Sequence, residues 1–154
     1  LALASISKLN AAGIKCTVLT KGILPASLVH LSPENEYGIT LISLDEEYRK
    51  KMEPGAAPYR ERLEALRSLY DAGCRTWVSI EPYPTPNLIE QSLGDLLNAV
   101  NFVNKIIFGR TNYSKETSAY TEHRKFYNDK AAEVIQYCEK HHIEYHIKEG
   151  TITD

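Results

Sequence analysis

The sequence predicts an α/β fold built on a parallel sheet, and three observations lead to this prediction. Short apolar, β-branched segments alternate with amphipathic helical segments along the chain. One of them, residues 39–44, is almost continuously apolar, which is typical of a strand buried on both faces. Gly13 and Gly73 directly follow helical segments, where glycine commonly caps a helix. Alternating strands and helices favour right-handed βαβ crossovers, and hence parallel strands.

The first half of the chain divides into helical and extended segments as follows. Ala2, Ile6 and Leu9 share one helical face before Gly13. The remaining expectations are a strand at 14–20, a short helix at 25–31, a turn at 32–36, the strand at 39–44 and a short helix at 45–51 ending at Glu53-Pro54-Gly55.

The second half continues the alternation. The clearest helix follows Pro58, with a stripe formed by Tyr59, Leu63, Leu66 and Tyr70. A strand at 74–81 is expected to end at Pro82, Pro84 and Pro86. The next helix is expected to begin with Asn87 and Glu90 as a capping box and to bury Ile89, Leu93, Leu96 and Val100. There follow a strand at 103–109, a polar loop at 111–121, a helix to about His142 with Tyr127, Ala131, Val134 and Cys138 inward, and a strand at 143–148.

Composition indicates one globular domain across residues 1–154. The chain is 43 % hydrophobic and 25 % charged, with a net charge of −2, so no basic excess favours nucleic acid as a partner. No apolar run approaches the roughly 18 residues that span a bilayer, and no signal peptide is evident. We therefore expect a cytoplasmic protein without a membrane segment, whose three separated cysteines are reduced.

The chain opens at Leu1, without Met, inside a helical segment, which suggests part of a larger protein. Five parallel strands are too few to close an eight-stranded barrel. They suit either a doubly wound sheet or part of a barrel, and periodicity alone does not choose between the two.

Polar residues at the carboxyl ends of the predicted strands are the candidate site, because ligands of parallel α/β folds bind there. Lys21, Ser43, Glu81 and Arg110 are the chief candidates; Asp45, Lys148 and Glu149 occupy similar positions. Each has an ordinary structural alternative. Lys21 could be a solvated loop lysine, Ser43 could bond to backbone, and Glu81 could pair with Arg110.

Other polar clusters point to no site. His141, His142 and His146 straddle a helix end and a strand, so we predict no metal site there. Phosphate-binding loops are absent, no catalytic residue is assigned, and Tyr113 and Tyr120 have no assigned role.

A series of motifs adds a family resemblance that covers nearly the whole chain. In order they are Thr20-Lys21-Gly22, Ile42-Ser43-Leu44-Asp45, Glu53-Pro54-Gly55-Ala56-Ala57-Pro58, Arg60-Glu61-Arg62-Leu63-Glu64-Ala65-Leu66, Ala72-Gly73 and Glu81-Pro82-Tyr83-Pro84-Thr85-Pro86-Asn87. The chain resembles radical S-adenosylmethionine (SAM) enzymes, and more narrowly their spore photoproduct lyase-like, or DNA repair photolyase, branch. The block from Ser43 to Gly73 is the most specific part.

The resemblance implies the C-terminal portion of a partial (β/α)6 barrel. Lys21 and Ser43 match positions that lie against SAM in that branch, whereas Glu81 and Arg110 are carried over by strand position only. Such enzymes hold a [4Fe–4S] cluster through a CxxxCxxC loop, which this chain lacks. The resemblance thus implies that the cluster-binding loop lies upstream of this chain. We therefore expect neither SAM nor the cluster to bind to this chain alone. We also expect an exposed sheet edge that could support a homodimer.

Two other functions stay open. A Schiff-base lyase of aldolase type would use Lys21 as its nucleophile. A non-catalytic α/β binding module would need none of these residues for chemistry. The substrate, including whether it is a small molecule or a nucleic acid, is not predicted.

Overall fold

The predicted α/β class is confirmed by a computed structural model, which describes residues 2–112 and 114–153. One all-parallel sheet has the strand order β1-β2-β3-β4-β5. The strands are β1 (Thr17–Thr20), β2 (Glu36–Thr40), β3 (Arg75–Tyr83), β4 (Lys105–Arg110) and β5 (Glu144–Ile147). The helices are α1 (Ala2–Ala11), the 3-10 helix η1 (Ala26–His30), α2 (Glu46–Met52), α3 (Tyr59–Asp71), α4 (Leu93–Ala99), α5 (Lys115–Ala119) and α6 (His123–His141).

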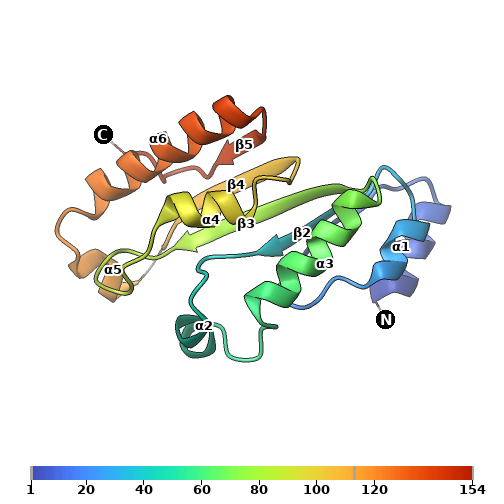
Figure 1. Ribbon diagram of the computed structural model, residues 1–154, viewed down its shortest axis with the longest axis horizontal. Coiled ribbons are helices and arrows are strands. Elements are labelled where there is room, and N and C mark those ends of the chain that lie inside the picture. Colours follow the sequence, from blue (N-terminus) through green and yellow to red (C-terminus); the bar gives the residue numbers. More distant parts are fainter. Residues whose placement is uncertain (1, 113, 154) are drawn as a thin grey trace.

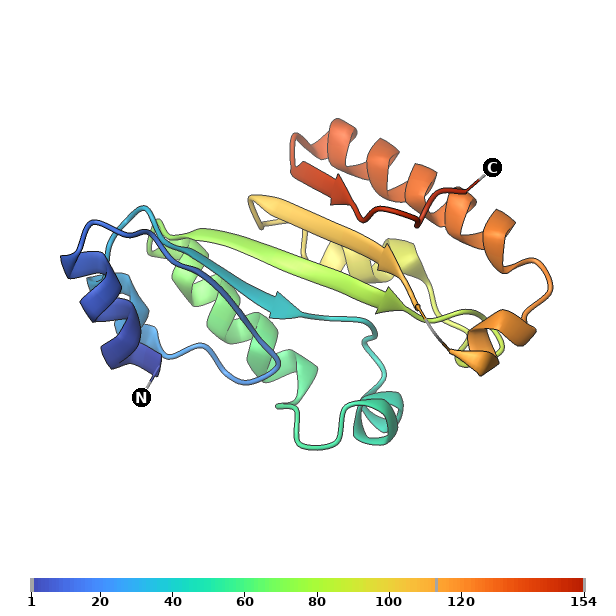
Figure 2. The ribbon, with the colours of Figure 1, turned by 180° about the vertical axis from the view of Figure 1, so that it is seen from behind.

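The three helices that connect or flank the central strands, α3, α4 and α6, lie on one face of the sheet (Figures 1 and 2). Strands that neighbour each other in chain order, joined by crossovers of one hand, place successive helices on the same side. Leu66 of α3 and Val134 of α6 belong to one core with Val78 and Ile106 of the sheet, and all four are fully buried. Burial of this apolar layer is the main stabilising contribution.

The opposite face of the sheet has no helix across it in either view (Figures 1 and 2). Because side chains alternate along a strand, Trp77 points away from the core to which Val78 belongs. Its indole covers Gly38 on β2, the residue with which it is in register. Leu19 of β1 is 49 % exposed on the same face. This face therefore combines one large buried aromatic side chain with uncovered apolar surface.

The second strand differs from the predicted one. We expected residues 39–44, but β2 covers Glu36–Thr40. Pairing begins early because the Asn35 side chain accepts a hydrogen bond from Cys16 N and Glu36 N donates to Cys16 O. Beyond Thr40 the chain loses β1 as a neighbour, since β1 ends at Thr20. Residues 41–43 are still buried, which explains their apolar pattern.

Three further boundaries were predicted wrongly in the second half. β3 continues through Pro82 to Tyr83, because an irregularity in the β3–β4 register accommodates a residue that lacks an N–H. Helix α4 is capped by Ser92, whose hydroxyl accepts from Asp95 N, so Asn87 and Glu90 form no capping box. The polar segment 111–121 contains the short helix α5.

Helix α6 is the longest helix among the described residues, yet it is apolar on one face only. At 19 residues it is long, yet its buried residues, Tyr127, Ala131, Val134 and Cys138, occupy one face only and match the predicted stripe. Across residues 2–112 and 114–153, no helix is both long and apolar enough to cross a bilayer.

Substituting Gly38→Ala should lower stability by about 1–3 kcal/mol, because the added Cβ would overlap the Trp77 indole. Urea unfolding would measure the change. Gly94→Ala is the matched control, since its nearest neighbour, Ser92 Oγ, would be 3.7 Å from the new Cβ, and alanine favours the helix. Equal stability of the two variants would contradict this packing.

Candidate functional site

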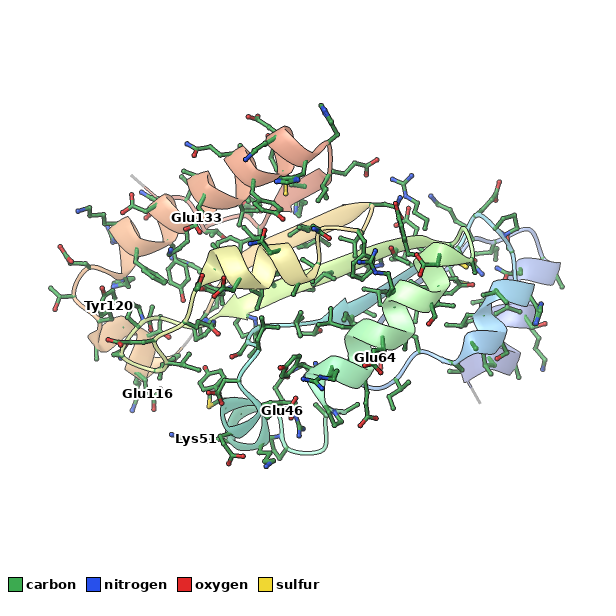
Figure 3. All side chains as sticks on the ribbon, viewed as in Figure 1. Glu46, Lys51, Glu64, Glu116, Tyr120 and Glu133 are labelled. Atoms are coloured by element: carbon green, nitrogen blue, oxygen red, sulfur yellow. The ribbon has the colours of Figure 1, made fainter. Side chains whose placement is uncertain are left out.

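The carboxyl ends of the strands face α2 and α5, and a cavity of about 380 Å³ lies between these elements. Figure 3 labels Lys51 on α2 and Glu116 on α5, which lie at this end of the molecule. The cavity is lined by Lys21, Ile42, Tyr48, Lys51, Met52, Glu53, Pro82, Leu88, Thr111, Ser114 and Glu116. Its wall thus combines segments far apart in the sequence, and its volume is within the range of small-molecule sites.

Lys21 follows β1 and is held at both its backbone and its side chain. Its carbonyl accepts a hydrogen bond from Ala57 N at 2.9 Å. Its Nζ lies 3.0 Å from Glu53 Oε1, in an ion pair whose approach does not have hydrogen-bond geometry. The Lys21 side chain remains 49 % exposed, so the ammonium is available to a ligand.

Glu53 is the centre of a buried charge network. Its side chain is 2 % exposed, and its second oxygen accepts a hydrogen bond from Arg62 at 3.1 Å. Arg62, 1 % exposed, also donates to the carbonyl of Thr40 at 2.6 Å, while its Nε has no hydrogen-bond partner. One carboxylate therefore serves two cations, which leaves the network with a net positive charge.

Helix α2 brings an uncharged aromatic side chain to the cavity. Asp45 caps the helix by accepting a hydrogen bond from Tyr48 N at 2.7 Å. Burial, followed by the nearby Tyr127 and Glu53, raises the pKa of Tyr48. The Tyr48 phenol is therefore neutral at physiological pH and contributes mainly apolar surface.

A tyrosine network holds the wall on the far side. Tyr127 Oη donates to Tyr83 O at 2.7 Å and accepts from Thr111 N at 3.2 Å. Thr111 Oγ1 donates to the same Tyr83 carbonyl at 3.1 Å. The residue after β4 is thus fixed against the end of β3, which gives the cavity a rigid side.

Of the four chief candidates, only Lys21 lines this cavity. Ser43 is buried, accepts a hydrogen bond from Asp45 N, and lines an adjacent cavity of about 280 Å³ with residues of α4. Glu81 lies on the uncovered sheet face, 3.6 Å from Lys148, and Gly109 leaves room for its side chain. Arg110 Nε donates to Asn112 at 2.9 Å. The four residues share one end of the sheet without sharing one wall.

The sequence did not single out Glu53, Arg62 or Lys51 as site residues. The predicted α3 stripe was also rotated: Arg62, Leu66 and Leu69 are buried, whereas Tyr70 is 37 % exposed. Arg62 precedes Leu66 by four residues, so helical spacing could have placed an arginine on the buried face. Its partner Glu53 had no comparable signal, because it belongs to an irregular segment.

The cysteines and histidines test whether the chain itself could hold a metal or a cluster. Cys16, Cys74 and Cys138 are free; Cys16 directly precedes β1, Cys74 directly precedes β3 and Cys138 lies on α6. Within the part of the chain that the structure describes, no three His, Cys, Asp or Glu side chains form a metal-binding group. His142 instead ends α6 in the left-handed conformation. These residues do not fit an iron–sulfur cluster. Tyr120 packs edge-on against Phe126, and Tyr113 lies outside the described residues.

Comparison with known proteins gives a distant similarity to a viral protein. An uncharacterized protein, ORF301 of Acidianus two-tailed virus, is 25 % identical over 99 residues, which cover 62 % of this chain and 33 % of the viral protein. The match thus spans about a third of the relative's length. No protein-family model and no solved structure matches.

Substituting Glu53→Gln should destabilise the fold by about 3 kcal/mol, because it removes the charge that compensates the buried Arg62. Urea unfolding would measure this loss. Glu47→Gln removes an exposed partner of Lys50 on the same helix and should leave the unfolding free energy nearly unchanged. Similar effects from both variants would show that the buried pair contributes no special stability.

Thiol reactivity should distinguish Cys138 from the other two cysteines. Burial raises the pKa of the Cys138 thiol to about 11, so only about 0.1 % is thiolate at pH 8. Cys16 and Cys74 are partly exposed. At pH 8, a disulfide reagent such as DTNB should therefore titrate two thiols in the native protein and the third only in denaturant. Three fast-reacting thiols would contradict the buried position of Cys138.

Proposed function

We propose that this chain is the C-terminal part of a radical SAM enzyme of the spore photoproduct lyase-like type, and that it contributes the SAM-facing half of a partial barrel. The partial barrel is supported by one observation: the strands follow the order β1 to β5 without interruption, and α3, α4 and α6 lie on one face of the sheet. A doubly wound sheet reverses its strand order and has helices on both faces. A barrel wall has helices outside only.

The uncovered face of the sheet supports the same proposal. In a barrel this face is the interior, and it is filled by side chains from alternate strand positions. Trp77 occupies such a position, and its Nε1 is buried without a hydrogen-bond partner. Strands β1 and β5 are the two edges of the sheet. Upstream strands could pair with β1, and edge pairing between two copies is the alternative that the exposed edge allows.

SAM contacts are proposed for two strand-end positions. Lys21 directly follows β1, and Ser43 follows Ile42, which lines the same cavity as Lys21. Both residues match the motif positions on which the resemblance rests. Glu81 and Arg110 are included as neighbours at the same end. When bound with its cluster, SAM would supply the radical; this chain's residues would bind and orient it.

The cluster itself has no ligands in this chain. Three converging thiolates are needed, and Cys16, Cys74 and Cys138 do not converge. The proposal therefore assigns the cluster loop to an upstream segment of a longer cytoplasmic protein and assigns no redox step to these residues.

The ion pair of Lys21 counts against the Schiff-base alternative. A nucleophilic lysine needs a free amine, whereas Lys21 Nζ lies 3.0 Å from the Glu53 carboxylate in an ion pair. Borohydride trapping with a carbonyl substrate would detect a Schiff base directly. We expect no adduct on Lys21.

The longer gene product that contains this sequence should become brown on anaerobic reconstitution with iron and sulfide, and should then cleave SAM reductively to 5′-deoxyadenosine. Lys21→Ala should weaken SAM binding about tenfold, the loss expected for one charged contact, without lowering the iron content.

Lys50→Ala is the control, because Lys50 is exposed and pairs with Glu47 on the same helix. A longer product that lacks a CxxxCxxC sequence and remains colourless would refute the radical SAM proposal. Equal SAM affinities of the Lys21→Ala and Lys50→Ala variants would show that Lys21 does not contribute to SAM binding.

A further inference from the structure

We infer that the cavity between α2 and α5 binds a small amphipathic anion, with an apolar body and a single carboxylate, phosphate or sulfonate group. The inference rests on the cavity's shape and charge and does not depend on the radical SAM proposal. SAM has a carboxylate but is cationic overall, because its ammonium and sulfonium outweigh that single negative charge, so the amphipathic anion inferred here is a different molecule. Both ligands would use the Lys21 ammonium and would therefore compete for this cavity.

The apolar body is indicated by hydrophobic surface that the protein leaves uncovered. Met52 is 46 % exposed, Pro82 is exposed and Leu88 is half-buried, although all three line the cavity. Ile42 and Tyr48 are buried beneath them. A ligand that covers these side chains gains hydrophobic free energy without disturbing the core.

The anionic group is indicated by the balance of charge. Glu53 is shared between Arg62 and Lys21, so its single negative charge does not neutralise both. Lys51 has no carboxylate partner among the described residues, whereas the adjacent Lys50 pairs with Glu47 at 2.7 Å. Against these cations, the described residues that line the cavity offer one further carboxylate, that of Glu116.

Two of the hydroxyl groups in the cavity wall are not available to bind the anion. Ser114 Oγ donates to Glu116 Oε2 at 2.9 Å, and Thr111 Oγ1 donates to the Tyr83 carbonyl. Both hydroxyl protons are therefore used within the protein. Among the described lining side chains, Lys51 and the exposed Lys21 ammonium are the cationic donors for an anionic group, and the Tyr48 phenol is a neutral one.

Two dyes that differ in charge test the inference on the chain as it stands. 8-Anilino-1-naphthalenesulfonate combines an apolar ring system with a sulfonate, and N-phenyl-1-naphthylamine lacks the sulfonate. Lys51→Met should weaken binding of the sulfonate dye about five- to tenfold, because one charge-assisted contact is lost. The same substitution should change the affinity for the neutral dye by less than about twofold. Fluorescence titration measures both affinities.

Lys50→Met is the matched control, because it removes the neighbouring charge from the same helix and should change neither affinity. Met52→Glu places a carboxylate on the exposed surface of the cavity. This variant should lower the affinity for the sulfonate dye more than tenfold, because the two negative charges repel each other. Circular dichroism would confirm that each variant is folded.

Three outcomes would overturn the inference. The sulfonate dye could bind all variants equally, which would place it on other apolar surface such as that around Leu19. Lys51→Met could weaken both dyes alike, which would remove the charge preference. The third outcome is that neither dye binds to the protein. None of these results bears on cluster assembly or SAM cleavage, so failure here is distinguishable from failure of the proposed function.

Discussion

The buried pair between Arg62 and Glu53 is the interaction on which the arrangement of the site depends. It joins three parts of the chain, because Arg62 lies on α3, Glu53 follows α2, and the guanidinium also donates to the Thr40 carbonyl at the end of β2. Both charges are almost fully removed from water, which costs free energy unless their geometry compensates for it. The motifs at residues 53–58 and 60–66, which contain Glu53 and Arg62, are therefore held together by this one ion pair.

The same pair determines the electrostatics of the cavity. Since Glu53 is committed to Arg62, its contact with Lys21 leaves positive charge at the end of β1. Helix α2 adds Lys51, while Tyr48 contributes a neutral ring. A buried ion pair thus has two roles: it anchors a loop to the sheet, and it makes an adjacent apolar cavity attractive to an anion.

The one-sided sheet is the second constraint. Its helices cover one face, and the other face carries Trp77 across Gly38 with Leu19 exposed nearby. A parallel sheet is usually covered on both faces, because its strands are apolar on both. A barrel interior satisfies that requirement through the curvature of the sheet itself. For this physical reason we propose a barrel wall rather than an open, doubly wound sheet.

Local sequence determined the fold class, the alternation of elements, the α6 stripe and the position of Lys21 at a strand end, because helical periodicity and glycine caps are properties of neighbouring residues. It placed β2 about three residues too late and rotated the α3 stripe, since Asn35 and Arg62 form their contacts with residues distant in the sequence. Only the tertiary structure separated Ser43, Glu81 and Arg110 from the cavity of Lys21 and brought Glu53, Arg62 and Lys51 around it. Those positions depend on how segments pack, which a linear pattern does not contain.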